Sequence, residues 1–81
     1  MTKLINEPVK IHSKDELSPR AFTWRKRRYR ITEVINWWRQ PAPWDRDAIY
    51  LFLRVNATNA STGTYELCRV GDDWFLHRVI D

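Results

Sequence analysis

The chain has 81 residues, including five tryptophans, three tyrosines, three phenylalanines and a single cysteine. This length allows one domain, and a lone cysteine excludes a disulfide within the chain. The longest apolar run, Ala48–Leu53, is too short to span a membrane, and Met1–Ile11 is too polar for a signal peptide. We therefore expect one soluble, cytoplasmic, monomeric domain over residues 1–81 that has no membrane partner. Within it, residues 1–7 are allowed to be flexible.

Positive charge is concentrated in one segment of the chain. The 14 basic and 10 acidic residues give a net charge of +4. Residues 20–39 hold seven of the basic residues and one acid, Glu33, so this window carries +6 and the rest of the chain carries −2. Concentrated charge produces a local field that dispersed charge does not, and with interleaved aromatic residues it indicates a polyanionic partner such as DNA or RNA.

The first elements in chain order have β-type patterns. Pro8–His12 alternates apolar and polar side chains, which predicts a short strand, and Ser13–Pro19 is a polar connector. Residues 22–31 alternate in the same way on either side of Arg25–Arg27, which predicts a hairpin with these basic residues at its tip. Arg28 and Arg30 then point outward. The inward face is expected to hold Phe22, Trp24, Tyr29 and Ile31.

The period changes after residue 32. Glu33–Arg39 fits either a bulged strand or one helical turn. The remaining elements are expected to be a loop at Pro41–Asp47, a strand at Ile49–Val55, a flexible polar turn at Asn56–Gly63, and two strands, Thr64–Val70 and Trp74–Ile80, joined through Gly71–Asp73.

These elements predict a mainly β fold with at most one short helix. We expect a small antiparallel sheet of five to six strands, bent into a roll or a partly open barrel. A flat sheet of this size would leave one face and two edges exposed to solvent.

The last three predicted strands share a pattern of period two. One face of each carries large apolar residues followed by an arginine: Tyr50, Phe52 and Arg54; Tyr65, Leu67 and Arg69; Trp74, Leu76 and Arg78. Two interpretations are open. The apolar residues form the core with the arginines at its rim, or they form an exposed platform on which bases stack. The small size of the chain favours the core, because apolar surface this large is rarely left exposed.

Residues with catalytic or ligating chemistry are sparse. The two glycines lack the spacing of a phosphate-binding loop. His12, Cys68 and His77 are too few and too scattered for a zinc site. The acidic pairs at positions 45/47 and 72/73 lie in predicted turns, where aspartate bonds the local backbone. We therefore expect no enzyme, no catalytic residue, no metal and no cofactor.

Three stretches carry a resemblance to a known family: Phe22–Trp37 (FTWRKRRYRITEVINW), Thr64–Arg69 (TYELCR) and Asp73–Asp81 (DWFLHRVID). In order and spacing, from Pro8 to Asp81, the chain resembles a small bacterial family of unknown function. Its members stand alone or are fused to the C-terminus of ImuB-like relatives of Y-family translesion polymerases. The resemblance implies a β-rich bacterial cytosolic domain in the neighbourhood of DNA repair, and it assigns no catalytic residue.

Two functional hypotheses follow from the sequence. In the first, the chain is a nucleic-acid-binding accessory module: Arg25, Lys26, Arg27, Arg28 and Arg30 hold phosphates, and Trp24 or Tyr29 stacks on a base. In the second, it is a protein-interaction module that docks to a repair polymerase or another protein through Trp37, Trp38 and Trp44. Two bland alternatives stay open, namely a basic tip that only solubilises the chain and a strand edge that pairs with a second copy.

Overall fold

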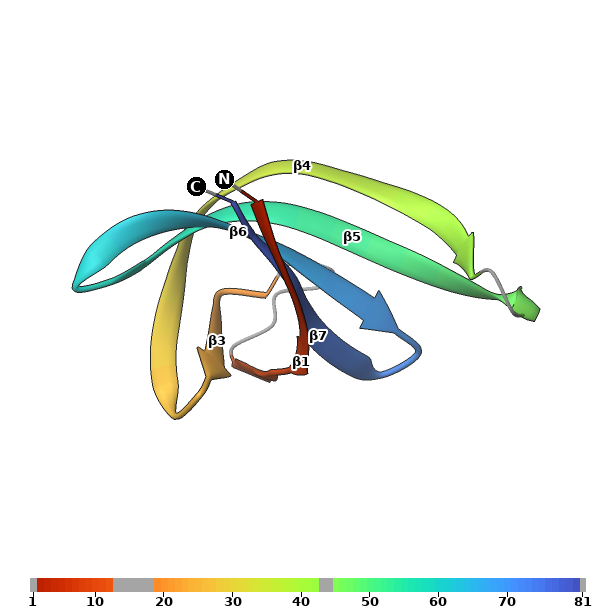
Figure 1. Cartoon of the computed structure of the whole chain (residues 1–81), viewed down its shortest axis with the longest axis horizontal. Coiled ribbons are helices and arrows are strands. Elements are labelled where there is room, and N and C mark those ends of the chain that lie inside the picture. The colour runs from red at the N-terminus through yellow and green to blue at the C-terminus, as the bar shows by residue number, and fades with distance from the viewer. Residues whose placement is uncertain (1, 13–18, 43–44, 81) are drawn as a thin grey trace.

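The computed structural model describes residues 2–12, 19–42 and 45–80, and these residues form seven strands and no helix. The strands are β1 (Thr2–Pro8), β2 (Lys10–His12), β3 (Ala21–Trp24), β4 (Arg27–Ala42), β5 (Asp45–Asn59), β6 (Ser61–Val70) and β7 (Asp73–Ile80). They form one antiparallel sheet in the order β1-β7-β6-β5-β4-β3-β2 (Figure 1). The predicted mainly β fold is confirmed, with more strands than the five to six expected. None of the described segments is a helix long and apolar enough to cross a membrane.

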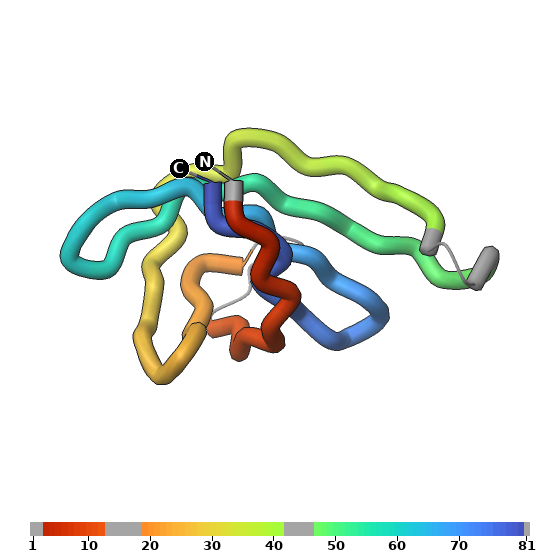
Figure 2. The backbone as a smooth tube through the Cα atoms, in the orientation of Figure 1, coloured from red at the N-terminus to blue at the C-terminus, as the bar shows by residue number. Residues whose placement is uncertain are grey.

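Both edges of the sheet come from one continuous run of chain. Only Val9 separates β1 from β2, yet β1 pairs with β7 and β2 pairs with β3. The amide of Val9 donates to the carbonyl of Trp74 at 3.0 Å, which anchors the corner between the two strands. The sheet therefore curls until its edges meet in this run, and the result is the half-barrel traced in Figure 2.

The core lies on the concave, inner face of this half-barrel. Leu53 of β5 pairs with Leu67 of β6, which pairs in turn with Leu76 of β7, so side chains from three strands meet on one face. The buried core cluster consists of Phe22, Tyr29, Leu53, Val55, Ala57, Leu67, Trp74 and Leu76. We call the opposite side of the sheet the outer face.

The three predicted strands that share a pattern do not all turn the same predicted face to the core, because of the register in which they pair. On β6 and β7 the apolar residues of the predicted face do lie in or against the core. On β5, however, Phe52 pairs with Cys68 on the outer face, and the core residues are Leu53 and Val55. A bulge in β7 leaves His77 without a partner in β6, since Glu66 pairs with Arg78 and Leu67 with Leu76.

Two further elements differ from the sequence expectation, and for a third the structure decides between two open alternatives. Residues 1–7 had no strand signal, whereas Thr2–Pro8 forms the edge strand β1. The predicted polar turn at Asn56–Gly63 is wrong, because β5 continues to Asn59 and β6 begins at Ser61, with the reversal at Ala60. Glu33–Arg39 is the bulged strand rather than the helical turn.

Proline at position 41 does not end β4, which continues to Ala42. Beyond Arg30 no residue of β3 pairs with β4, and the Ile31 amide donates to the carbonyl of Arg20 at 2.8 Å; past Ile31, the described part of the chain leaves this edge of β4 open. An edge strand tolerates proline because no ladder bond is lost there. We call residues 32–42 of β4, together with the β5 residues paired with them, the arm; it projects beyond the other strands in Figure 1.

Candidate nucleic-acid interface

The basic cluster lies on the hairpin formed by β3 and β4. Phe22 pairs with Tyr29 and Trp24 with Arg27, which leaves Arg25 and Lys26 as a two-residue turn. Their φ angles are 51° and 64°, and a type I′ turn requires positive φ at both positions. Two non-glycine residues in this conformation make the tip tight and strained.

The inward face of the hairpin belongs to the core. The ring of Tyr29 stacks on that of Phe22, with centroids 5.1 Å apart, and lies 5.4 Å from that of Tyr65. Only 9% of Tyr29 is exposed, so no face of its ring is open to a base. The predicted inward orientation is observed, and the proposed stacking role of Tyr29 is incompatible with this burial.

Trp24 is half-buried and already engaged on two sides. Its Nε1 donates to Oε1 of Glu7 at 3.0 Å, and the guanidinium of Arg25 lies over its ring, 4.5 Å from the centroid. A base would have to displace Arg25 to stack on that side of the ring. The geometry therefore favours a structural role for this tryptophan as well.

Arg25 is tied to β1 rather than free at the tip. Its Nη2 donates to Oε2 of Glu7 at 2.7 Å and its Nε donates to Oε1 at 3.1 Å, a bidentate pair. The hydrogen bonds from Arg25, and after them the one from Trp24, lower the pKa of the Glu7 carboxyl below its usual value. Arg25 thus joins the hairpin to the opposite edge strand, and its charge is largely matched.

The other four basic residues of the hairpin are exposed: Lys26, Arg27, Arg28 and Arg30. No acidic group of the described residues forms an ion pair with any of them. Arg28 lies beside Thr23 of β3 and Arg30 beside Thr58 of β5, so both are on the outer face. The surface keeps its positive charge because only neutral side chains flank it in the sheet.

Lys10 of β2 extends this surface. It pairs with Thr23, which pairs with Arg28, so the three residues form a row across the outer face. We call Lys10, Lys26, Arg27, Arg28 and Arg30 the basic face, although Lys26 lies in the turn and Arg27, which pairs with Trp24, lies on the inner side of the hairpin next to the tip. Sequence reasoning missed Lys10, because nothing in the local pattern shows that β2 lies next to β3.

The tryptophans proposed for protein docking do not form one patch. Trp37 pairs with Leu53 on the inner face of the arm and is 58% exposed, whereas Trp38 pairs with Phe52 on the outer face. The ring of Trp38 stacks on that of Phe52 with centroids 5.3 Å apart. Trp44 lies outside the described residues. Adjacent residues of a strand point to opposite faces, which separates the first two.

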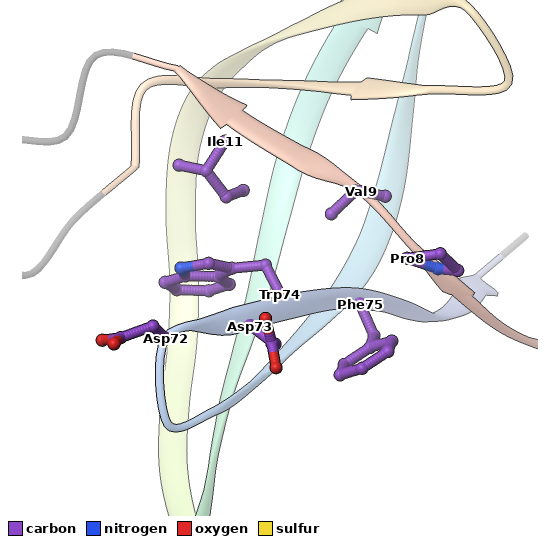
Figure 3. A pocket seen from close by; sticks show the side chains of 7 residues that line it. All are labelled: Pro8, Val9, Ile11, Asp72, Asp73, Trp74 and Phe75. Carbon is purple, nitrogen blue, oxygen red and sulfur yellow. The ribbon is translucent and has the colours of Figure 1, made fainter.

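Among the cavities on the surface of the described residues, two lie next to candidate functional residues. The smaller, of about 280 Å³, lies at the corner between β1 and β2 and contains Asp72 and Asp73 (Figure 3). Val9 and Ile11 approach the Trp74 side of this cavity. Asp72 lies in the turn before β7, as predicted, whereas Asp73 is the first residue of β7 and pairs with Val70. Within the described ranges, no three His, Cys, Asp or Glu residues come close enough to hold a metal ion.

The larger cavity, of about 490 Å³, lies on the outer face over β5, β6 and β7. Phe52 and Cys68 form its buried part, although both are on the side of the sheet opposite the core. It could not be predicted from the sequence, because it depends on which residues of β5 pair with which residues of β6 and β7. We call it the outer pocket.

Fold and surface together define a small all-β half-barrel with a basic face at one end. The chain belongs to a family described as a domain of unknown function (DUF6504), whose model matches residues 1–81. A search of curated proteins and a search of solved structures each gave no match.

Proposed function

We propose that this domain is a nucleic-acid-binding accessory module that holds the phosphates of a single strand on its basic face. The observation that carries the proposal is the set of four exposed hairpin cations, which have no acidic partner among the described residues. Guanidinium groups suit bidentate contact with phosphate oxygens, and a cluster of them without acidic partners produces a local positive field that attracts a polyanion.

The burial of Trp24 and Tyr29 sharpens the proposal. The aromatic residues hold the hairpin rigid, while the cations project from its tip and outer side. Contact is then made with the backbone of the nucleic acid rather than with its bases at this end of the domain. The resemblance to domains fused to translesion polymerase relatives makes DNA the first probe.

Salt dependence tests this directly. Labelled single- and double-stranded oligonucleotides are titrated with the wild-type domain by fluorescence anisotropy at several salt concentrations. If the four free hairpin cations each neutralise one phosphate of a single strand, the slope of log K against log salt is about −3. Absence of binding at low salt would overturn the proposal.

A matched pair of variants separates local contact from overall charge. Replacing Arg28 and Arg30 by glutamine removes two charges from the basic face, and we expect the slope to become shallower by about 1.4. Replacing the exposed Arg39 and Arg78 by glutamine removes the same charge outside that face. Equal losses in both double variants would mean that only net charge matters.

A second candidate function rests on the exposed side of the arm. Val34, Ile35 and Trp37 are large exposed apolar residues within four positions of one another on β4. Such a patch is typical of protein docking, to a repair polymerase or another partner. Capture of partners from host lysate that survives nuclease treatment and fails with Trp37→Ala would favour it. Loss of every partner after nuclease treatment would remove its support.

A further inference from the structure

The outer pocket has the size and lining of a site for a small planar group. Its volume of about 490 Å³ lies within the usual range for ligand sites, roughly 300–1,000 Å³. Four rings line it, those of Tyr50, Phe52, Phe75 and His77, together with the apolar side chains of Cys68 and Val70. The ring centroids of Tyr50 and Phe52 are 6.0 Å apart in an edge-to-face arrangement. Apolar walls of this kind accept a flat aromatic group.

The polar groups of the pocket are neutral with one exception. Nδ1 of His77 lies 2.8 Å from Oδ1 of Asn6, and burial lowers the pKa of this histidine. Burial also raises the pKa of the Cys68 thiol to about 11. The carboxylate of Asp73 is the remaining charged group among the lining residues. The pocket therefore repels an anion, while Asp73 can accept hydrogen bonds from an amino group on a ring.

The outer face of β5 leads from this pocket to the basic face. Successive outward residues of β5 run from Tyr50 to Thr58, and Thr58 pairs with Arg30. Eight residues of strand span about 26 Å. A nucleic-acid strand of that length has roughly eight nucleotides at the stacked spacing of about 3.4 Å, and fewer when extended. A single ligand can thus reach both sites.

Trp38 and Arg54 lie between the two sites, also on the outer face. The guanidinium of Arg54 is 5.7 Å from the ring centroid of Trp38, and its Nη2 donates to Glu66 at 3.2 Å. The Arg54 side chain remains 42% exposed in spite of these contacts. A strand that crosses this part of the face therefore meets a ring and a cation, which suits a backbone with attached bases.

We propose that the outer pocket binds one base of the same single strand whose phosphates contact Arg28 and Arg30. This inference rests on the proposed function, and it adds the path of the bound strand along β5 and the number of nucleotides that the path requires. A neutral planar ring suits the pocket and an anionic chain suits the basic face. A nucleic-acid strand carries both at the required separation.

An abasic scan tests the proposal. The probe is a labelled eight-nucleotide DNA strand in which one base at a time is removed. We expect one position near the end of the strand to lose about tenfold in affinity, and the others to lose less than threefold. The substitution Val70→Trp fills the pocket without changing charge, and it should weaken binding about tenfold and flatten the scan. Ile49→Trp introduces the same indole at an exposed site on the other face of β5, outside the pocket, and should change neither.

Nucleosides distinguish failure of this inference from failure of the proposed function. Uncharged cytidine or adenosine, added at millimolar concentration, should shift the amide NMR signals of Cys68, Val70 and Phe75 in the wild type and not in Val70→Trp. If oligonucleotides bind, but all abasic positions lose affinity equally and nucleosides do not shift the pocket amide signals, the base site in the outer pocket is overturned and the proposed function is not. Shifted pocket amides without oligonucleotide binding support the pocket as a base site and overturn the role of the basic face. Circular dichroism melts confirm that each variant is folded.

Discussion

In the first part of β4, Tyr29 pairs with Phe22 of β3 and packs into the core. Further along the same strand, Trp37 projects from the arm into solvent. Both residues are aromatic and both point to the inner face. The difference arises from what lies beside the strand. β3 pairs with β4 only as far as Arg30, and Ile31 is the last residue on that edge with a described partner, the carbonyl of Arg20. Beyond Ile31, one edge and much of the inner face of β4 have no cover from the described residues.

This contrast shows that alternation predicts which residues share a face, while burial depends on the neighbouring strands. The hairpin and the arm therefore expose different kinds of side chain to solvent. The aromatic residues of the hairpin are packed in the core and its cations are exposed, whereas the arm exposes the apolar side chains of Val34, Ile35 and Trp37. Substitutions in the hairpin and in the arm test this difference, and the largest effect is expected for the aromatic residues.

Truncation of the two aromatic residues should have very different consequences. Tyr29→Ala removes a ring that stacks on Phe22, and we expect a loss of about 3–5 kcal/mol in the free energy of unfolding. Trp37→Ala removes a largely exposed ring, and we expect a change below about 1 kcal/mol. Urea unfolding followed by circular dichroism measures both. Comparable losses would mean that the arm is packed in solution against something else.

The same distinction explains which features the sequence could predict. The inward residues of the hairpin belong to two strands joined by a short turn, so the local alternation alone identified Phe22 and Tyr29. The partner of Arg25 is Glu7, eighteen positions away on β1, and that strand had no pattern of its own. The local period does not show that the chain run from β1 to β2 closes the sheet.

Bulges account for the other part that could not be predicted. Asn6 has a φ of 53° and lies in the irregular stretch of β1 between Leu4 and Glu7, opposite the extra residue His77 of β7. One added residue shifts the following side chains to the other face, so a strict period of two misplaces them. The outer pocket contains both irregular residues, which is why the sequence did not reveal it.

The strained tip of the hairpin should respond to a single substitution. Lys26 has a φ of 64°, a conformation that costs an L-residue about 1–2 kcal/mol and glycine almost nothing. We expect Lys26→Gly to stabilise the domain by about 1 kcal/mol, or roughly 4–8 °C in Tm, relative to Lys26→Ala. The alanine variant loses the same charge but keeps the strain, which makes it the control. Equal melting temperatures for the two variants would show that the tip relaxes in solution.

The ion pair between the hairpin and β1 should have the smallest effect, and it is the one that depends on pH. Arg25→Gln removes the partner of Glu7, so we expect a lower Tm at pH 7, whereas Arg39→Gln on the arm, where the guanidinium only lies near Trp37, should leave the Tm almost unchanged.

The sign of the pH dependence follows from the carboxylate. Because the pKa of Glu7 in the folded chain is lowered from 4.5, the pair contributes fully above pH 4.5, and its contribution disappears as the pH falls through the folded value. Thermal melts of the wild type and Arg25→Gln from pH 7 to pH 2 should therefore show a constant gap that closes only in acid. A gap that persists at pH 2 would mean that Arg25 stabilises the hairpin through its contact with the Trp24 ring, since that contact does not depend on the charge of Glu7.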